Sequence, residues 1–409
     1  MAKNTKPAIR FKGFTDAWEQ RKLGEICEKI TMKNTNMDVT ETFTNSAEFG
    51  IISQRDFFDH DIAKQDKIDG YYIVHPEDFV YNPRISVTAP VGPINRNKLG
   101  RCGVMSPLYS VFRPNGMDNT FLEQFFKSSY WHSFMRLNGD SGARSDRFSI
   151  KDSVFFDMPI PCPNLQEQES VGRFLYSIDN LITLHQRKYD SLVNVKKAML
   201  EKMFPKNGET VPEIRFKGFT DAWEQRKLGE IATEVNRNDP ESIAPIMMIT
   251  ANNGFIEQSE RYAFNNAGES LKKYILLERG ELAYNHGASK LRPYGSCFAL
   301  TNTENARIPF VYHCFSVGEN DSEFISIELN GSEIERQLRR IVSSGARMDG
   351  LLNISYEEYS TVELNLPSIE EQQAISGFFH ILDHLITLHQ RKLEKLKNIK
   401  KSCLEKMFV

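Results

Sequence analysis

The stretch IRFKGFTDAWEQRKLGEI, residues 9–26, recurs without a single change at residues 214–231. A second block repeats with 13 of its 26 residues unchanged, since PNLQEQESVGRFLYSIDNLITLHQRK at residues 163–188 returns as PSIEEQQAISGFFHILDHLITLHQRK at residues 367–392. The chain therefore has two halves, each with a short block, a long intervening segment and a second block. Two copies are too few for a stacked solenoid, so the sequence predicts a pseudo-two-fold architecture.

The segments between the repeated blocks, residues 27–162 and 232–366, are much less alike. We interpret this contrast as one scaffold used twice, with the repeated blocks performing the same task and the intervening segments binding different ligands. A genetic exchange that made the flanks uniform without functional meaning is the alternative. The two segments share only short sequences, which include Tyr81-Asn82 with Tyr284-Asn285, and Ser141-Gly-Ala-Arg144 with Ser344-Gly-Ala-Arg347.

Long amphipathic segments follow the second blocks. From Val171 to Met203, and again from Ile375 to Met407, seam positions alternate at spacings of four and three. A heptad seam of this length predicts a coiled coil, in which each helix is about 50 Å long at about 1.5 Å per residue. The seam residues expected to form the coiled coil or bind partners are Ile178, Ile182, His185, Leu192, Leu382, Ile386, His389 and Leu396.

Polar residues interrupt this seam at equivalent places in the two helices. His185 and His389 could be ligands or proton switches, but a single imidazole in an apolar seam is more often a packed, hydrogen-bonded residue, and we prefer that interpretation. Lys196 and Lys400 can set the register of the helices, as polar seam residues do. The outer faces of the helices are basic, which usually means only that they are solvated.

The intervening segments have the character of mixed α and β structure. Short runs rich in β-branched and aromatic residues alternate with Gly, Pro and Asn. Sandwich, barrel and compact α+β folds are all compatible with this pattern. Strands are predicted at residues 71–74, 78–81, 273–277 and 308–312, and helices at residues 121–135 and 332–342.

The charge balance gives no overall sign of a nucleic-acid binder. The 409 residues include 51 Lys and Arg against 54 Asp and Glu, a formal net charge of -3. Any nucleic-acid site must therefore be local. Residues 81–101 and 282–303 contain basic residues and no acidic ones, and the two Ser-Gly-Ala-Arg motifs offer guanidinium groups for phosphate or guanine. The candidate DNA contacts are Asn82, Arg84, Arg96, Lys98, Arg101, Ser141, Arg144, Arg147, Asn285, His286, Lys290, Arg292, Ser344 and Arg347.

Motifs for catalysis, metal binding and membrane insertion are missing from the sequence. The six cysteines are scattered, without CxxC pairs or histidines at ligand spacing, so we expect reduced thiols and neither a metal site nor disulfides. No segment has the length of a membrane span or the pattern of a signal peptide, which favours a soluble, cytoplasmic protein. Phosphate loops, dinucleotide fingerprints and the common hydrolase, deaminase and methyltransferase motifs are also absent. We expect no catalytic residues, and a chain that recognises a target without transforming it.

The arrangement of blocks resembles that of the specificity subunits of type I restriction-modification enzymes. The residues that carry the resemblance are Trp18–Ile26 with its copy Trp223–Ile231, the Pro-x-x-x-Glu-Gln sequences at Pro163–Gln168 and Pro367–Gln372, and the long helices that follow them. The resemblance extends over essentially the whole chain.

This resemblance implies an α+β fold with two pseudo-symmetric target-recognition domains joined by two long antiparallel coiled-coil helices. It places the first recognition domain at residues 1–162, the first helix and connector at 163–208, the second recognition domain at 209–366 and the second helix at 367–409. The implied function is recognition of a bipartite, asymmetric sequence in double-stranded DNA, with helix length setting the spacer between its halves.

The resemblance also implies partners and cofactors. Two modification subunits would bind S-adenosylmethionine and methylate adenine, and two restriction subunits would use ATP and Mg, while this chain itself binds no cofactor and catalyses nothing. Two rival hypotheses remain at this point: a coiled-coil adaptor that binds proteins instead of DNA, and an enzyme with an unrecognised active site.

Overall fold

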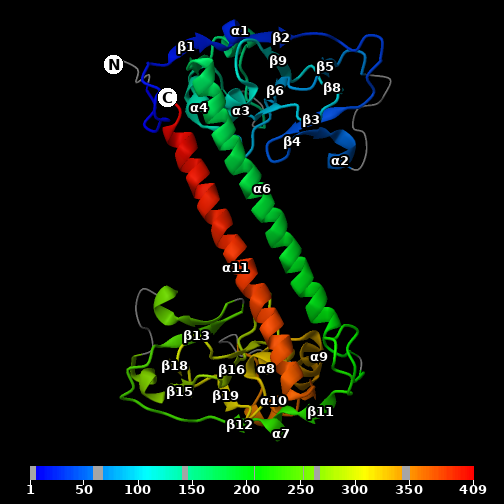
Figure 1. Cartoon of the computed structure of the whole chain (residues 1–409), viewed down its shortest axis with the longest axis vertical. Helices are drawn as coiled ribbons and strands as arrows, with labels where there is room; N and C mark the ends of the chain where they lie inside the picture. Colours follow the sequence, from blue (N-terminus) through cyan, green and yellow to red (C-terminus); the bar gives the residue numbers. More distant parts are fainter. Residues whose placement is uncertain are drawn as a thin grey trace. The chain divides into compact units, whose positions relative to one another are not determined.

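The computed structural model describes residues 6–58, 68–140, 146–206, 208–251, 253–261, 268–342 and 351–409. The chain forms two compact units (Figure 1). The first comprises Met1–Arg187 with Gln390–Val409, and the second comprises Lys188–His389. Each unit therefore contains one globular part and half of each long helix.

The first unit has an antiparallel four-stranded sheet of order β2-β9-β6-β7 at its centre. Three two-stranded ladders, β3-β4, β5-β8 and β1-β10, surround this sheet. The strands are β1 (Glu19–Lys22), β2 (Cys27–Ile30), β3 (Phe43–Ser46), β4 (Gly50–Ser53), β5 (Tyr72–Val74), β6 (Phe79–Tyr81), β7 (Ile94–Arg96), β8 (Gly103–Met105), β9 (Ser110–Pro114) and β10 (Pro159–Cys162). The helices are α1 (Leu23–Ile26), α2 (Gln54–Phe58), α3 (Asn119–Lys127), α4 (Tyr130–Asn138), α5 (Asp152–Phe156) and the start of α6 (Leu165–Lys202).

The second unit repeats this arrangement, with a sheet of order β12-β19-β16-β17 and the ladders β13-β14, β15-β18 and β11-β20. Its strands are β11 (Glu224–Lys227), β12 (Thr233–Glu234), β13 (Met247–Thr250), β14 (Gly254–Glu257), β15 (Ile275–Glu278), β16 (Leu282–Asn285), β17 (Ser296–Ala299), β18 (Asn305–Ile308), β19 (His313–Ser316) and β20 (Glu363–Leu366). Its helices are α7 (Leu228–Ile231), α8 (Ser322–Leu329), α9 (Ser332–Ile341), α10 (Tyr356–Tyr359) and α11 (Ile369–Lys406), with short 3-10 turns at Gln258–Glu260 and Gly268–Lys273.

The two units thus share one topology despite their unlike sequences, which confirms the predicted common scaffold. Even the register agrees, because Tyr81 pairs with Ser110 and Tyr284 pairs with His313 at equivalent places in the two sheets. The Tyr-Asn pair that the two segments share has a structural cause. The hydroxyl of Tyr81 donates to the Val91 carbonyl at 2.9 Å, and that of Tyr284 donates to the Tyr294 carbonyl at 2.6 Å.

A glycine closes the loop after each Tyr-Asn pair. Gly92 and Gly295 have φ values of +85° and +81°, and a Cβ atom there would lie 2.1 Å and 2.5 Å from the carbonyl oxygens of Asn82 and Asn285. Only glycine tolerates both the left-handed backbone and this close approach. The loops between β6 and β7 and between β16 and β17 therefore close in the same way while differing in sequence.

The repeated blocks make the same contacts in both units. In the first, Trp18 packs edge-on against Phe121 and against Phe408 at the end of α11. In the second, Trp223 packs in the same manner against Phe324 and against Phe204 at the end of α6. The end of each long helix therefore packs against the tryptophan of the identical block. This shared task accounts for the close repetition of the flanks.

An ion pair joins each short block to the beginning of the long helix that follows it. Arg10 makes two bonds of 2.6 and 2.7 Å to the buried carboxylate of Glu167. Arg215 makes two bonds of 2.7 Å to Glu371. Bidentate pairs of this kind are strong and fix the relative orientation of their partners. They attach each globular part to its helix.

The long helices pack together as the predicted antiparallel coiled coil, and each has 38 residues. The seam residues are buried or half-buried along both helices, including His185 and His389. The seam lysines form ion pairs with the opposite helix: Lys196 with Asp383 at 2.5 Å in the second unit, and Lys400 with Asp179 in the first. The end of one helix thus meets the start of the other, and these pairs favour a single register.

Two local predictions were wrong. The helix predicted at residues 121–135 is interrupted after Lys127, where the Ser128 hydroxyl donates back to the Phe125 carbonyl and the chain restarts as α4. The strand predicted at residues 308–312 ends at Ile308, because Pro309 has no backbone N–H and its carbonyl accepts a turn bond from Tyr312. No helix in the described part of the chain is long and apolar enough to span a membrane.

Candidate nucleic-acid interface

The structure brings together the two basic segments that the sequence singled out in the first unit. Arg84, in the loop after β6, forms an antiparallel β-bridge with Arg147, which follows the first Ser-Gly-Ala-Arg motif. The Phe148 N–H donates to the Pro83 carbonyl at 2.7 Å, and the Ile85 N–H donates to the Asp146 carbonyl at 3.0 Å. The loop and the motif stem therefore lie side by side.

The second unit has the equivalent junction. Gly287 bridges Leu351, and the Leu352 N–H donates to the His286 carbonyl at 2.9 Å. The two units thus place a variable loop against the stem of a second variable segment in the same way. Ser141 and Arg144 in the first unit, and Ser344 and Arg347 in the second, lie outside the described residues.

Arg84 and Arg147 form an unneutralised pair of positive charges. Arg84 is exposed and Arg147 is half-exposed, and neither has an acidic partner in the described part of the chain. Two guanidinium groups on bridged backbone repel each other unless an anion lies between or near them. Arg147 also lines a surface hollow of about 420 Å³ with Tyr72 and Tyr109. This arrangement suits a phosphate backbone with a base or sugar beside it.

The tyrosines of this hollow were not found by sequence reasoning. Tyr72 belongs to β5, and Tyr109 lies just before β9, and both are far from Arg147 in the chain. The sequence around a tyrosine in a strand does not show whether its ring lies in the core or on the surface. Only the pairing of distant segments brings these rings beside Arg147.

Other basic candidates of the first unit pair with carboxylates of the protein. The Arg96 side chain is 8% exposed and contacts Glu77 at 2.9 Å and Glu123 at 2.6 Å. Lys98 also pairs with Glu123, at 3.0 Å. Arg101 makes two 2.7 Å bonds to Glu41, which raise the pKa of Arg101 and lower that of Glu41. Arg96 is thus buried in the scaffold, while Lys98 and Arg101 stay predicted DNA contacts that already have an acidic partner.

The asparagine candidates organise the loops from within. The Asn82 amide donates to the Asn45 carbonyl at 2.8 Å, and its oxygen accepts the Arg84 N–H at 2.9 Å. Asn285 repeats both bonds, to the Ile249 carbonyl and from the Gly287 N–H. These side chains shape the backbone of each loop and have little capacity left for DNA.

In the second unit, His286 and Arg292 also have internal partners. His286 is 5% exposed, and both of its ring nitrogens contact backbone carbonyls. Arg292 donates to the Asn330 carbonyl at 2.7 Å, and burial lowers its pKa. Lys290, by contrast, is exposed at the tip of the loop between them and has no acidic partner among the described residues. Lys290 is therefore the remaining basic candidate of this loop.

A buried charge cluster in the first unit binds the globular part to both long helices. Glu123 of α3 contacts Arg96, Lys98 and Lys127, and Lys127 also contacts Asp179 of α6 at 3.0 Å. Burial acts to raise the pKa of Glu123, but the three nearby cations outweigh it and leave this pKa below its usual value. The cluster is a set of interdependent charges that cannot be removed singly without cost.

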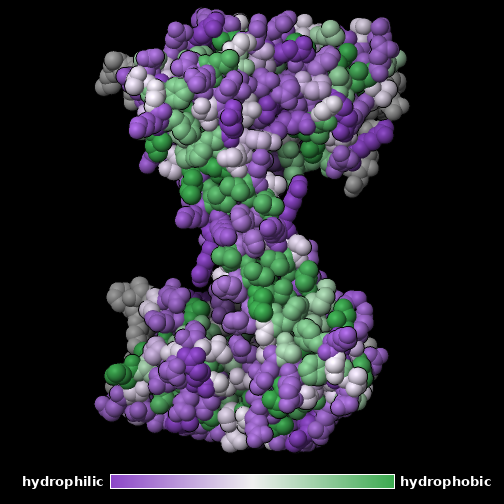
Figure 2. Space-filling view, viewed as in Figure 1, coloured by the Kyte–Doolittle hydropathy of each residue, from purple (hydrophilic) through white to green (hydrophobic). Residues whose placement is uncertain are grey.

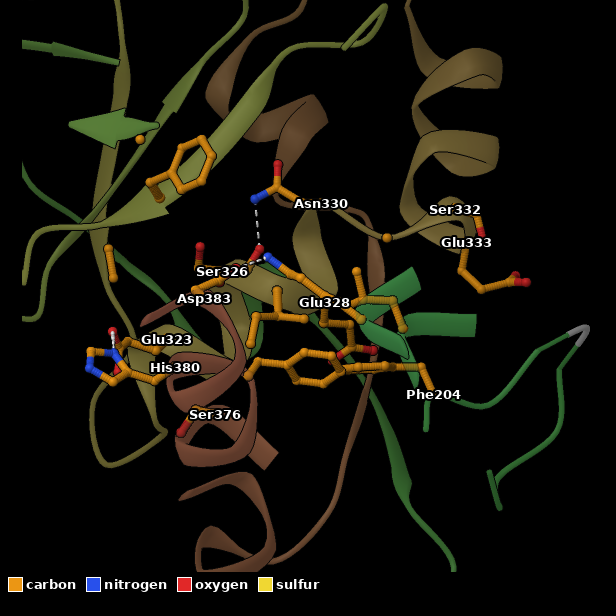
Figure 3. Close-up of a pocket in the computed structure, with 18 of the residues that line it drawn as sticks. Phe204, Glu323, Ser326, Glu328, Asn330, Ser332, Glu333, Ser376, His380 and Asp383 are labelled. Carbon is orange, nitrogen blue, oxygen red and sulfur yellow. Dashed lines mark hydrogen bonds and ion pairs between the residues drawn. The ribbon is translucent and has the colours of Figure 1, made fainter. Parts of the chain in front are cut away.

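The second unit has a cavity of about 590 Å³ at the corresponding place. Ala299, Ser326 and Asn330 stand there at the register positions of Arg96, Glu123 and Lys127. Figure 3 shows Ser326 and Asn330 beside this cavity, with His380 and Asp383 approaching from α11. The shared scaffold therefore attaches its two globular parts to the helices with different chemistry.

One buried carboxyl beside this cavity has no charged partner. Glu328 of α8 accepts the Asn365 N–H through one oxygen, at 2.5 Å, while its other oxygen has no hydrogen-bond partner among the described residues. Burial raises the pKa of Glu328 to about 8, in spite of the Asn365 bond. Phe125 occupies the equivalent position in the first unit and is fully buried.

Comparison with known proteins relates these features to one family. The sequence model of the type I restriction modification DNA specificity domain matches residues 15–194. The MjaVIII specificity subunit of a type I restriction enzyme from Methanocaldococcus jannaschii is 22% identical over 338 residues, covering 75% of this chain and 73% of the relative. The chain is similar to type I restriction-modification specificity subunits.

Two further proteins show the same similarity. The putative MjaX specificity subunit from the same organism is 20% identical over 275 residues, covering 63% of this chain and 60% of the relative. The crystal structure of the type I S subunit from M. genitalium has a TM-score of 0.57 at 12% identity, covers 99% of both chains and shares the fold. Although the family model ends at residue 194, the second half repeats the element order of the first. The similarity to specificity subunits favours DNA recognition over the protein adaptor.

Proposed function

We propose that this specificity subunit reads a bipartite, asymmetric sequence in double-stranded DNA, with one half-site for each unit. By holding that sequence it directs adenine methylation and restriction by partner subunits. The observation that carries the proposal is the bridged pair Arg84 and Arg147, two cations without an acidic partner in the described chain, at a loop junction that recurs in the second unit.

The chemistry of the junction supports two kinds of DNA contact. Phosphate contacts position a protein on the duplex, and groups that reach the base edges give specificity. The loops after β6 and β16 have the same stems and different side chains, so the units would bind DNA in a similar manner and prefer different bases. The proposed contacts are Arg84, Arg147 and Lys290, with Ser141, Arg144, Ser344 and Arg347 beyond the described residues.

The long helices offer equivalent docking places for a partner that binds twice. Leu184 and Leu388 lie at the same position of the identical octamer LITLHQRK, outside the seam, and are 47% and 37% exposed. Hydrophobic residues gather on the visible face of these helices (Figure 2). Identical exposed sequences favour identical partners, so we assign this surface to two modification subunits. Two restriction subunits would complete the complex.

In this proposal the partner subunits carry out the reactions, and this chain catalyses none. S-adenosylmethionine would bind to the modification subunits, and ATP and Mg to the restriction subunits. This chain would bind no cofactor and would contribute the position of the DNA. Purified alone, it should bind duplex DNA in a salt-dependent manner, yet transfer no methyl group from S-adenosylmethionine and cleave no DNA with Mg.

Methylome sequencing tests the proposal directly. A strain that expresses this chain with its modification subunit should acquire methylated adenines in one split sequence with two unlike halves. The same strain with Arg84→Ala and Arg147→Ala combined should show reduced methylation at those sites, because the first half-site is held less tightly. Methylation without a common sequence, or full methylation by the double variant, would contradict the proposal.

A further inference from the structure

His286 makes a junction in the second unit that the first unit lacks. Its Nδ1 lies 2.8 Å from the Leu352 carbonyl oxygen, and its Nε2 lies 2.8 Å from the Val311 carbonyl oxygen. The ring is buried, and the Leu352 N–H returns a bond of 2.9 Å to the His286 carbonyl. One side chain therefore joins three segments: the loop after β16, the chain before β19 and the stem at residues 351–354.

Carbonyl oxygens accept hydrogen bonds and cannot donate them. Both contacts of His286 are satisfied together only when each ring nitrogen carries a hydrogen, which is the case in the imidazolium cation. A neutral ring can donate to only one of the two carbonyls, and the other nitrogen then faces an oxygen lone pair. In either form, the ring donates at least one hydrogen bond that attaches the loop to a neighbouring segment.

A stack of rings surrounds this junction. His313 of β19 lies 5.1 Å from His286, between ring centres, and its Nε2 is 3.1 Å from the Ile354 carbonyl. Tyr284 of β16 lies 6.3 Å from His286. Burial lowers the pKa of His313, and the neighbouring His286 adds to this effect, while Glu234 of β12 and Glu357 of α10 act in the opposite direction.

The equivalent positions in the first unit are Pro83 and Ser110, which cannot take part in such a junction. There the loop and the stem are joined through backbone bonds, from Phe148 to Pro83 and from Ile85 to Asp146. Neither bond depends on a histidine side chain. The first unit is thus an internal control within the same molecule.

We infer that His286 is a positioning residue for DNA reading by the second unit, fixing its recognition loop against the stem at residues 351–354. This inference rests on the proposed function. The loop carries the exposed Lys290 and is anchored again at Arg292, which donates to Asn330. Loss of the His286 contacts would free one end of the loop while the other end stays attached. The second half-site would then be read less well, with the first unaffected.

The experiment uses the full chain assembled with its modification subunit. Binding is measured to the methylated target identified above and to duplexes altered in one half-site at a time. Wild type is compared with His286→Ala and His286→Gln, and His380→Gln is the matched control. His380 is an exposed histidine of the same unit that faces Glu323 and lies away from the loop.

We expect His286→Ala to lower discrimination at one half-site by about tenfold, the effect of losing a buried hydrogen bond. Discrimination at the other half-site and binding by His380→Gln should not change. His286→Gln should restore part of the loss, because an amide also donates hydrogen bonds.

Three outcomes separate the hypotheses. Absence of sequence-specific binding by wild type would overturn the proposed function itself. Specific binding with equal loss of discrimination in His286→Ala and His286→Gln would overturn the role of the His286 hydrogen bonds alone. Discrimination unchanged by His286→Ala would do the same. Retained discrimination at the first half-site shows that the variant chain is folded there.

Discussion

The basic side chains of the recognition units fall into two groups according to whether the fold supplies an acceptor. Arg96 and Arg101 meet carboxylates, and Arg292 meets a carbonyl oxygen, so these cations stabilise the scaffold. Arg84 and Lys290 meet no acid in the described chain. A cation left without an acid on a folded surface remains available to a phosphate, and this difference decides which arginines concern DNA.

Replacing Arg84 and Arg147 by alanine should weaken DNA binding by about 1–3 kcal/mol in total. It should also reduce the slope of log affinity against log salt by about 2, because each phosphate contact contributes roughly 0.9. Titration of a labelled duplex at several salt concentrations measures both quantities. Arg136→Ala, which removes an exposed arginine from α4, is the control. An unchanged salt slope in the double variant would show that neither arginine contacts phosphate.

Glu328 makes the stability of the second unit depend on pH. Its folded-state pKa of about 8 lies above the ordinary value of 4.5, so the folded unit keeps a proton that the unfolded chain releases. Stability must therefore fall as the pH rises from about 4.5 to about 8. Each pKa unit corresponds to about 1.4 kcal/mol, which makes the total a few kcal/mol.

Glu328→Gln removes this titration and keeps an acceptor for the Asn365 N–H. The variant should be more stable than wild type at pH 8 and closer to it near pH 4.5, as measured by denaturant unfolding across that range. Glu319→Gln, at an exposed glutamate of the same unit, should follow wild type. A constant difference between Glu328→Gln and wild type at all pH values would contradict the assigned shift.

At the scale of elements, the two globular parts hold the same helices by different means. In the first unit, α3 is joined to α6 through the buried cluster around Glu123, and Lys400 brings in α11. In the second unit, the cavity beside α8 takes the place of these charges. The topology fixes where the elements meet, and the side chains determine how firmly they are joined.

Glu123→Gln should destabilise the first unit by about 3–5 kcal/mol, since it leaves buried cations without their partner. Hydrogen exchange should show the loss of protection in α3 and the strands beside it. Ser326→Ala, at the equivalent position in the second unit, should cost less, because it removes only one hydroxyl bond to the Cys297 carbonyl. Equal loss of protection in the two variants would argue against a special role for the cluster.

We expect the length of the two long helices to set the number of unspecified base pairs between the half-sites. Inserting seven residues into both helices, after Lys188 and after Lys392, preserves the heptad seam and lengthens each helix by about 10 Å. The methylated sequence should then gain about three unspecified base pairs, at about 3.4 Å per base pair. Methylome sequencing reads the spacer directly. An unchanged spacer with unchanged half-sites would show that helix length does not measure DNA.

For the whole molecule, the important property is that one topology carries two unlike sequences between repeated flanks. We therefore expect the chain to tolerate an exchange of the two intervening segments. Replacing residues 232–366 by residues 27–162 joins the new segment to the same flanking blocks at both ends. Because the contacts of those blocks are equivalent in the two units, the new chain should fold.

Such a chain should direct methylation to a target whose two halves are copies of the first half-site. Comparison of methylated sequences in strains with the wild-type and exchanged chains tests this expectation. The reciprocal chain, with residues 232–366 in both places, should give copies of the second half-site. Retention of the original asymmetric target by either chain would contradict the assignment of one half-site to each unit.

The sequence by itself determined the two-fold repetition, the coiled-coil seam and the family, because each depends on periodicity or on identity between segments that can be read along the chain. It also indicated the loops after Tyr81 and Tyr284, whose acid-free composition is a local property. The tertiary structure alone decided which cations in those regions are free. Arg96 looks no different from Arg84 in the sequence, and only folding places Glu123 beside Arg96 and Arg147 beside Arg84. Neutralisation depends on distances of a few ångströms between residues far apart in the chain, and no local pattern records them.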